Sequence, residues 1–469
     1  MLKLYNTLTR RLDNFQPINP PHVGLYTCGP TVYGTAHLGN LRTYVFEDVL
    51  RRVLEFNRFA VKHVMNITDV GHLTSDADEG EDKIERAARA LKRDAVTIAR
   101  QYENEFFRDL ERLNVRQPTT ILRATETIAL QLELIKRLQE KGFTYRTSDG
   151  LYFDTAKFPR YGQLSGQRVA EKMAGARVKV NPAKRQPTDF ALWKFSPPGA
   201  KRQMEWSSPW GVGFPGWHVE CSAMSMKELG EQFDLHTGGI DHISIHHENE
   251  IAQSEAATGK HPFVRYWLHG EFLILPGQRM GKSEGNMLTL DDVAKRGFHP
   301  WAFRYLILQT HFRSKLAFSW DALAAADQGL KRLWAFVDSI PEQPRIGCAE
   351  FEERFRQAVN NDLDTPQALA ILHEMLRSDY PGRAKLQSLA VFDRVLGLGL
   401  TATAERPHLQ PLDATTTERL SRLIAEREQA RTDKNWSRAD QLRHHINQLL
   451  EPHGRVLDDT SDGPSIRVR

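Results

Sequence analysis

The chain has few cysteines, no long apolar run and no large excess of charge of either sign. Only three cysteines occur in 469 residues, Cys28, Cys221 and Cys348. This excludes a disulfide scaffold and fits a reducing, cytoplasmic setting. No apolar stretch approaches the roughly 18 residues of a membrane span, and charges interrupt the first residues, MLKLYNTLTRRLDNFQ, too often for a secretory signal. We therefore expect a cytoplasmic, multidomain enzyme or binding protein with no membrane association.

The charge balance leaves the partner open. The 63 basic residues exceed the 59 acidic residues by four, which neither requires nor excludes a nucleic acid. The excess is local, because residues 167–202 carry nine Lys and Arg against two acids. That stretch fits either a solvated surface segment or a positively charged lid or nucleic-acid face.

The first part of the chain predicts a βαβ unit. Residues 23–33 (VGLYTCGPTVY) have the pattern of a buried strand that runs into a Gly/Pro turn. Apolar residues four apart then predict a helix with one apolar face: Leu41, Val45, Val49 and Val53. Residues 60–67 have the β-branched content of a strand. This order predicts an α/β fold with a parallel sheet covered by helices.

The rest of the chain changes character several times. We expect charged helices at 82–114 and 122–141, and then short β-like pieces rich in Gly, Pro and Trp over 142–216. The α/β pattern returns at Phe233, with a helix from His246 and the FLILP segment as a strand. Residues 320–400 are helical in pattern, and 413–469 combine a charged helix with short β-like pieces.

Three short motifs carry polar groups suited to a nucleotide. His37 and Gly39 lie between the first strand and its helix, where free N–H groups and the helix dipole favour a phosphate. Gly238 and Gly239, followed by Asp241, leave backbone room and a carboxylate for a ribose. A flexible loop with a lysine between glycines can reach a phosphoryl group: Arg279, Met280, Gly281, Lys282 and Ser283. Each motif alone also fits an ordinary turn or loop.

A fourth set of residues suits a metal ion. His246 and Glu250 are four apart and therefore share a helix face. With Cys28 and Cys221 they offer thiolate, imidazole and carboxylate groups, which Zn²⁺ accepts. No CxxC spacing is present, so the cysteines also fit small buried hydrophobes. Further candidate ligands are His236, His242 and His247.

Taken together and in order, these residues resemble the cysteinyl-tRNA synthetase family of the class I aminoacyl-tRNA synthetases. The resemblance runs from residue 6 to about residue 457. It is strongest in CGPTVY (28–33), NITD (66–69), DFALWK (189–194), SPWGVGFPGWHVECSAM (208–224), HHENEIAQSEAATG (246–259) and MGKSEGN (280–286). It implies that L-cysteine and ATP, with Mg²⁺, form cysteinyl-adenylate, and that cysteine then passes to the 3′ end of tRNA(Cys). The expected protein is a monomer.

The resemblance also implies domains and residue roles. The expected fold is a Rossmann-like parallel-sheet catalytic domain with an insertion, then a helical tRNA-binding bundle and a small C-terminal domain. The boundaries are 1–118 and 217–265 for the catalytic domain, 119–216 for the insertion, 266–318 for a stem-contact region, 319–402 for the bundle and 413–469 for anticodon binding.

The implied residue roles follow the matched positions. The zinc ligands would be Cys28, Cys221, His246 and Glu250, and one Zn²⁺ would select the cysteine thiol. Cysteine would lie against Thr68, Trp217 and His236. Catalysis would use His37, Asn40 and Lys282, and ATP would be bound by Gly39, Gly238, Gly239, Asp241, Arg279, Met280, Lys282 and Ser283. The anticodon would be read by Arg431, Trp436, Asp440 and Arg443.

Three departures from the family pattern affect these roles. Asn40 replaces the last His of the HIGH motif, and RMGKS replaces KMSKS. Residues 71–82 form an acidic insertion. The rival interpretations are a cysteine ligase of the mycothiol-pathway type acting on an amino-sugar, a catalytically inactive paralogue and a generic nucleotidyltransferase. The helical and C-terminal blocks favour tRNA over an amino-sugar, and the retained ligand set argues against an inactive paralogue.

Overall fold

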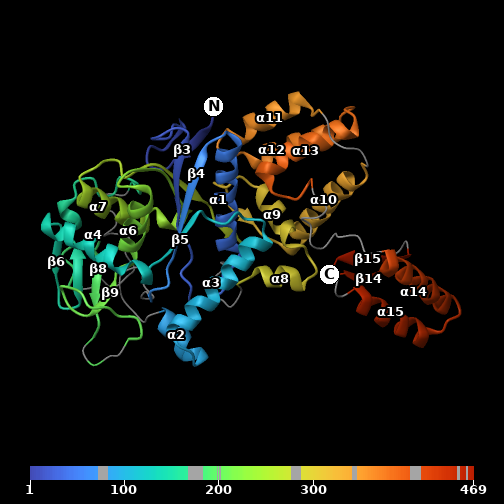
Figure 1. Cartoon of the computed structure of the whole chain (residues 1–469), viewed down its shortest axis with the longest axis horizontal. Helices are drawn as coiled ribbons and strands as arrows, with labels where there is room; N and C mark the ends of the chain where they lie inside the picture. Colours follow the sequence, from blue (N-terminus) through green and yellow to red (C-terminus); the bar gives the residue numbers. More distant parts are fainter. Residues whose placement is uncertain are drawn as a thin grey trace.

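A five-stranded parallel sheet forms the centre of the protein (Figure 1). The structure, a computed structural model, describes residues 1–71, 83–166, 183–197, 199, 202–275, 287–340, 346–401, 414–450, 455–460 and 463–468. The strand order is β11-β10-β3-β4-β5, with bounds β3 His22–Thr27, β4 Ala60–Ile67, β5 Thr120–Arg123, β10 Phe233–Gly239 and β11 Val264–Gly270. Helix α1 (Leu38–Phe56) joins β3 to β4. The predicted α/β fold and βαβ unit are thereby confirmed.

The strand order reverses between β3 and β10. From β3 the chain adds β4 and β5 on one side, and it later adds β10 and β11 on the other. In open parallel sheets, ligands bind beyond the carboxyl ends of the strands at such a reversal. Cys28 follows β3 and Gly239 ends β10, so both lie at this point.

Helices cover both faces of the sheet because its side chains alternate. Leu25 belongs to a core shared with α1 and α3 (Ala95–Arg112). The next residue, Tyr26, belongs to a core shared with α4 (Ile128–Glu140), α6 (Trp217–Leu229) and α7 (His246–Thr258). Period-two alternation places neighbouring residues on opposite faces, which produces three layers.

The segment between the two halves of the sheet contains a smaller, antiparallel sheet. Its order is β6-β7-β8-β9, with bounds β6 Thr144–Arg146, β7 Gly150–Phe153, β8 Phe190–Phe195 and β9 Gly213–Pro215. β5 pairs with β4, so residues 120–123 lie in the main sheet and not in the insertion to which the sequence assigned them. Most of the basic stretch 167–202 lies outside the described residues.

Two of the expected helical regions are interrupted. The region 82–114 contains α2 (Lys83–Leu91) and α3, because Lys92 has a left-handed φ of 52°. The Asp94 side chain then accepts a hydrogen bond from Thr97 N–H and caps α3. The region 122–141 begins in β5 and a short 3-10 turn, η1 (Thr125–Thr127), before α4. The strand expected at FLILP is reduced to β12 (Leu273–Ile274).

A block of helices packs against α1, which covers one face of the parallel sheet. Its helices are α8 Leu290–Lys295, α9 Pro300–Leu308, α10 Trp320–Asp338, α11 Ala349–Val359, α12 Thr365–Arg377 and α13 Gly382–Leu396. They share one continuous core with α1. β12 pairs in parallel with β13 (Leu316–Ala317), and a hairpin of β1 (Lys3–Asn6) and β2 (Arg11–Asn14) lies at the N-terminus. Within the described part of the chain, no helix is long and apolar enough to cross a membrane.

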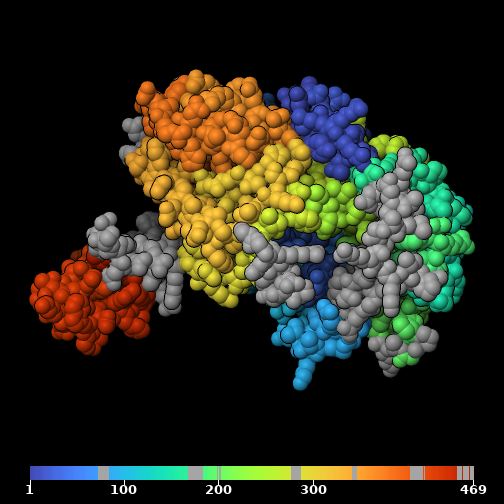
Figure 2. Space-filling view, turned by 180° about the vertical axis from the view of Figure 1, so that it is seen from behind, coloured from blue at the N-terminus to red at the C-terminus, as the bar shows by residue number. Residues whose placement is uncertain are grey.

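The C-terminal elements form a separate lobe (Figures 1 and 2). Helix α14 (Ala414–Thr432) packs on α15 (Trp436–Leu450), and α15 packs on a hairpin of β14 (Arg455–Thr460) and β15 (Gly463–Val468). This lobe has its own small core, which includes Leu442 and Ile446.

Candidate active site

A cavity of about 350 Å³ opens at the carboxyl ends of the parallel strands. It lies at the reversal of strand order, where β3 and β10 are neighbours. The structure brings ten of the predicted site residues to its lining: Cys28, His37, Asn40, Thr68, Trp217, Cys221, Gly238, Gly239, Asp241 and His246. These residues come from positions more than 200 apart in the sequence, so the fold unites the phosphate, ribose and metal motifs in one space.

The first turn of α1 is closed by reciprocal hydrogen bonds between His37 and Asn40. The His37 Nδ1 atom accepts from Asn40 N–H, and the Asn40 Oδ1 atom accepts from His37 N–H, both at 3.2 Å. Because Nδ1 accepts, the ring hydrogen of a neutral His37 lies on Nε2, which can donate. A Cβ on Gly39 would lie 2.9 Å from the His37 ring, so a larger residue there would displace that ring. Asn40 is therefore part of a capping box, which the sequence did not reveal.

The floor of the cavity is a buried cluster of ionisable side chains. Ligand atoms of Cys28, Cys221, His246 and Glu250 all lie within 4.8 Å of one another. Glu250 lies behind the cavity lining, and its Oε1 atom is 3.0 Å from His246 Nε2. That buried oxygen nevertheless makes no hydrogen bond. A ring nitrogen and a carboxylate oxygen that lie this close without hydrogen-bond geometry, beside two thiols, form a set of atoms that Zn²⁺ can bind.

A second set of four residues overlaps the first. His236 and His247 also lie within 4.8 Å of Cys28 and Glu250. Neither histidine lines the cavity, and both have ring nitrogens with protein partners. His236 Nε2 is 3.0 Å from Glu250 Oε2, and His247 Nδ1 is 2.8 Å from His269 Nε2. The set that contains Cys221 and His246 is therefore the one that a bound substrate can reach.

The charges of the cluster depend on one another. Burial alone lowers the pKa of His246, but the charges of Glu250 and Cys221 raise this pKa to about 10. Burial alone raises the pKa of Glu250, but His236 and His246 lower it to about 2. When no metal ion is bound, the positive charge of protonated His246 balances the negative charge of Glu250. A metal ion that binds there would displace this proton.

Several polar residues beside the cluster or the cavity were not found from the sequence. His218 Nδ1 lies 3.0 Å from His246 Nδ1, and Thr68 Oγ1 donates to the buried Glu220 carboxylate at 3.2 Å. His269 lies near the end of β11, and a polar residue at a carboxyl strand end was a usable signal. Partners of this kind orient ligand side chains. The sequence grouped His236 with the cysteine pocket, but it lies behind Glu250 and does not line the cavity.

The described residues include both flanks of the lysine loop but not the loop itself. Arg279, Met280, Lys282 and Ser283 lie outside the described residues, as does most of the acidic insertion. Both flanks of the loop contact α1, however. Leu38 N–H donates to the carbonyl of Leu288 at 2.8 Å, and the buried Arg42 guanidinium donates to the carbonyl of Glu271 at 2.7 Å. Helix α1, which carries Asn40, therefore contacts the chain on both sides of the loop.

The predicted anticodon residues lie far along the chain in the C-terminal lobe. Trp436, Asp440 and Arg443 are all exposed on α15 and share one face at helical spacing. The opposite face packs into the lobe's core. Arg431 lies in the last turn of α14. The exposed fraction of Trp436 is 60%, so packing does not explain its size.

Comparisons with known proteins match this chain to one family. The family described as the tRNA synthetases class I (C) catalytic domain matches residues 14–328. A cysteine–tRNA ligase of Burkholderia lata is 50% identical over 98% of this chain and 96% of its own length. A cysteine–tRNA ligase of Thermus thermophilus is 43% identical over 100% of this chain and 99% of its own.

Solved structures show the same fold at low sequence identity. A methionyl-tRNA synthetase of Mycobacterium tuberculosis, in complex with methionyl-adenylate, superposes with a TM-score of 0.57 at 15% identity. The match covers 82% of this chain and 92% of that one. Together with the full-length matches to cysteine–tRNA ligases, the parallel sheet with its cavity and buried Cys/His/Glu cluster leads to one conclusion. The chain belongs to the cysteinyl-tRNA synthetase family of the class I aminoacyl-tRNA synthetases.

Proposed function

We propose that the protein ligates L-cysteine to the 3′ end of tRNA(Cys) through a cysteinyl-adenylate, using ATP with Mg²⁺, and selects cysteine by its thiol through one Zn²⁺. The observation that carries this proposal is the position of the cluster. Its three cavity-facing ligands, Cys28, Cys221 and His246, share one cavity with the N-terminus of α1. One space can therefore hold an amino-acid side chain at one end and a triphosphate at the other.

Zn²⁺ would be held by Cys28, Cys221, His246 and Glu250. When bound, the ion would supply a soft Lewis-acid position that accepts a thiolate well and a serine hydroxyl poorly. Serine would leave the metal without a good ligand for its open position. A site that loses such an interaction with the wrong substrate discriminates strongly against it. The space for the amino acid is then lined by Trp217 and Thr68. The ring centroid of Trp217 is 4.3 Å from that of His246.

The nucleotide lies at the other end of the cavity in this proposal. The Nε2–H group of His37, with Asn40 beside it at the start of α1, faces the developing charge on the phosphates. Gly39, Gly238 and Gly239 let the nucleotide approach the backbone, and Asp241 accepts from the ribose hydroxyls. Lys282, with Arg279, Met280 and Ser283, binds the phosphates as pyrophosphate leaves.

The remaining regions would bind tRNA. The proposed domains are those of the sequence analysis, with β5 included in the catalytic sheet, and Arg431, Trp436, Asp440 and Arg443 read the anticodon. An arginine offers phosphate or base-edge contacts and a tryptophan offers a stacking plane. All three cysteines are free and buried, which supports a reducing, cytoplasmic setting. We further propose that the protein is a monomer.

An amino-sugar acceptor, as in a mycothiol-type cysteine ligase, is the alternative. It would need only the adenylation cavity. The described chain also includes the helices α10–α13 and the lobe with the exposed Trp436, and the cysteine–tRNA ligases match over nearly their whole length. These observations favour tRNA.

Aminoacylation of purified tRNA(Cys), with cysteine compared to serine and with or without a chelator, tests the proposal. We expect charging with cysteine, negligible charging with serine, and loss of cysteine charging after chelation that added Zn²⁺ restores. Charging that survives full removal of metal would overturn the role of zinc. Adenylate formation with no transfer to tRNA would favour the amino-sugar alternative.

A further inference from the structure

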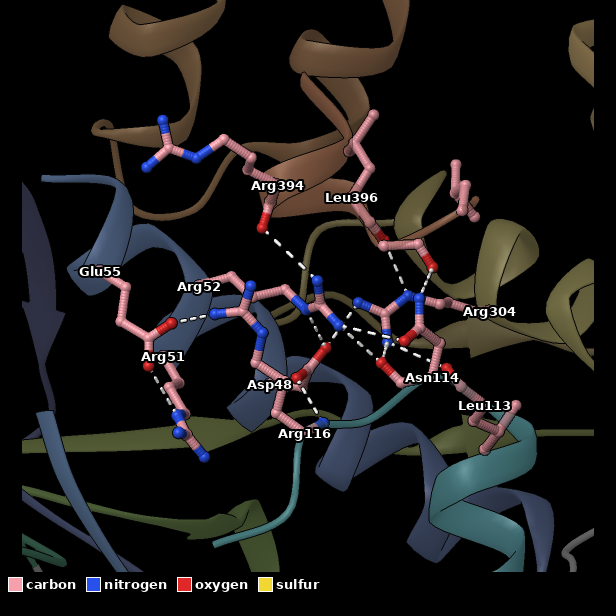
Figure 3. Close-up of polar contacts among 12 residues, drawn as sticks. Asp48, Arg51, Arg52, Glu55, Leu113, Asn114, Arg116, Arg304, Arg394 and Leu396 are labelled. Atoms are coloured by element: carbon pink, nitrogen blue, oxygen red, sulfur yellow. Dashed lines mark hydrogen bonds and ion pairs between the residues drawn. The ribbon is translucent and has the colours of Figure 1, made fainter. Parts of the chain in front are cut away.

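A buried ionic junction joins the catalytic domain to the helical bundle (Figure 3). Asp48 and Arg52 come from α1, and Arg304 comes from α9 of the stem-contact region, which packs against α10 of the bundle; none of the three is more than 5% exposed. The Asp48 Oδ2 atom accepts from Arg304 Nη2 at 2.6 Å and from Arg52 Nε at 2.7 Å. Asp393, in α13, interacts electrostatically with the same two arginines. Two acids, one in α1 and one in α13, therefore act on the two buried arginines.

The arginines also bind backbone carbonyls where two other helices end. Arg304 donates to the carbonyl of Leu396, the last residue of α13, at 2.7 Å, and to that of Leu113, just after α3, at 3.1 Å. Arg52 donates to the carbonyl of Asn114 at 2.7 Å. The last carbonyls of a helix lack partners within it and carry partial negative charge. The junction thus ties α1 and α9 to the ends of α3 and α13.

The chain that leaves α13 fits this junction closely. Gly397 has a left-handed φ of 62°, and its carbonyl accepts from Asn114 Nδ2 at 2.9 Å. A Cβ on Gly397 would lie 2.8 Å from the Arg304 guanidinium and 3.0 Å from that of Arg52. Alanine there would both strain the backbone and displace the arginines. The close packing at Gly397 therefore restricts the angle at which α13 docks on α1.

The same helix connects this junction to the cavity. α1 begins beside His37 at the cavity, and Asp48 lies about 16 Å further along its axis, at about 1.5 Å per residue. We propose that Asp48, Arg52 and Arg304 are positioning residues for the transfer of cysteine to tRNA, because they set the angle of the bundle relative to the cavity.

Activation and transfer depend on this angle differently. Cysteine and ATP need only the cavity, whereas a tRNA must bind the bundle and lobe and still deliver its 3′ end to the adenylate. This step rests on the proposed role of the bundle in binding tRNA. Small misplacements of reacting groups cost large factors in rate. A changed docking angle would therefore slow transfer and leave cysteine activation unchanged.

Two variants on opposite sides of the junction test the proposal in the full-length protein. Asp48→Asn removes the acid that pairs both arginines, and Gly397→Ala displaces them from the bundle side. We expect the kcat of tRNA charging to fall about 10-fold or more in both. Cysteine-dependent ATP–pyrophosphate exchange should keep its rate and its KM values, and the tRNA dissociation constant should change little. Gly397→Ala keeps the test available if Asp48→Asn folds poorly, since it leaves α1 intact.

Ser388→Ala is the matched control. The Ser388 hydroxyl accepts from Cys348 N–H and donates to Glu352 within the bundle, so its loss loosens the bundle without touching the junction. Neither half-reaction should change in this variant at a temperature where it is folded. The proposal is overturned if exchange and charging fall together in the junction variants, if charging is unchanged, or if the control shows the same split. Discrimination of cysteine from serine by the wild-type protein, measured separately, tests the proposed function and does not depend on these variants.

Discussion

The floor of the active-site cavity and the C-terminal lobe present their polar groups in opposite ways. Cys28 follows β3, Cys221 lies in α6, and His246 and Glu250 lie in α7; all four are buried. Trp436, Asp440 and Arg443 come from a single helix, α15, and all are exposed. The floor is created by tertiary contacts, whereas the lobe presents a surface that local helix geometry already defines.

This difference predicts how each region responds to mutation. A side chain on the cavity floor has several partners that lose an interaction when it changes, and burial makes an unsatisfied group costly. A side chain on the face of α15 has solvent on one side, so its loss affects a ligand more than the fold. We therefore expect changes in the floor to affect activation and stability together, and changes on α15 to affect tRNA alone.

The largest effect is expected for Cys221→Ser. Replacing one ligand of the floor should remove the metal and lower cysteine activation by about 100-fold or more, since even partners behind the ligands contribute 10- to 100-fold. Elemental analysis and pyrophosphate exchange measure the two effects. Cys348→Ser makes the same chemical change at a buried site in the bundle, and it should keep both metal and activity. Full activity in metal-free Cys221→Ser protein would contradict the predicted role of the ligand.

Trp436→Ala should have the next largest effect, and only on tRNA. A stacked base contributes about 1–3 kcal/mol, so kcat/KM for tRNA should fall about 10-fold or more while pyrophosphate exchange and Tm are unchanged. Trp436→Phe keeps a stacking plane and should retain most of the charging activity. If exchange collapses along with charging, Trp436 is a structural residue and the contrast between the two regions fails.

A smaller effect, on stability, is expected for Glu47→Gln in α1. Burial raises the pKa of Glu47 to about 8, against the opposing effect of a hydrogen bond from Thr237. Because this folded-state pKa lies above the ordinary value of 4.5, the folded protein holds the proton more tightly than the unfolded chain. The resulting stabilisation is complete below pH 4.5 and is lost as the pH rises towards 8.

Glutamine does not titrate. The Tm of the Glu47→Gln variant should therefore rise relative to that of the wild-type protein as the pH increases from 5 to 8. Thermal unfolding across this range measures the gain. Parallel Tm profiles would show that the carboxyl of Glu47 is not protonated in the folded protein.

The smallest effect is expected for Asn40→His, at the exposed rim of the cavity. A histidine Nδ1 atom can accept from the same N–H group, so the cap should persist and pyrophosphate exchange should stay within a factor of about three; loss of such a cap costs only about 1 kcal/mol. Asn40→Ala, which cannot cap, serves as the comparison. A fall of 10-fold or more in Asn40→His would mean that the carboxamide itself contacts the substrate.

Much of the fold could be predicted because it depends on local patterns. The β3–α1–β4 unit follows from an apolar run, a turn and a period near four, and the pairing of His246 with Glu250 follows from helical spacing. β5 was assigned to the insertion because four half-buried residues carry little pattern. The break at Lys92 depends on one backbone angle, which the surrounding helical composition conceals.

For the candidate site, too, local features could be predicted and long-range contacts could not. Residue types and helical spacing suggested a metal and a nucleotide, because these are properties of the residues themselves, whereas zinc and tRNA were implied by the resemblance to the cysteinyl-tRNA synthetases. Whether Cys28 meets His246 or His247, that Glu220 supports Thr68, and that Asp48 pairs with Arg304 across 256 positions all depend on how the sheet and helices pack. Such contacts join residues that are distant in sequence, and their distances come from close packing of the whole core, which no local pattern encodes.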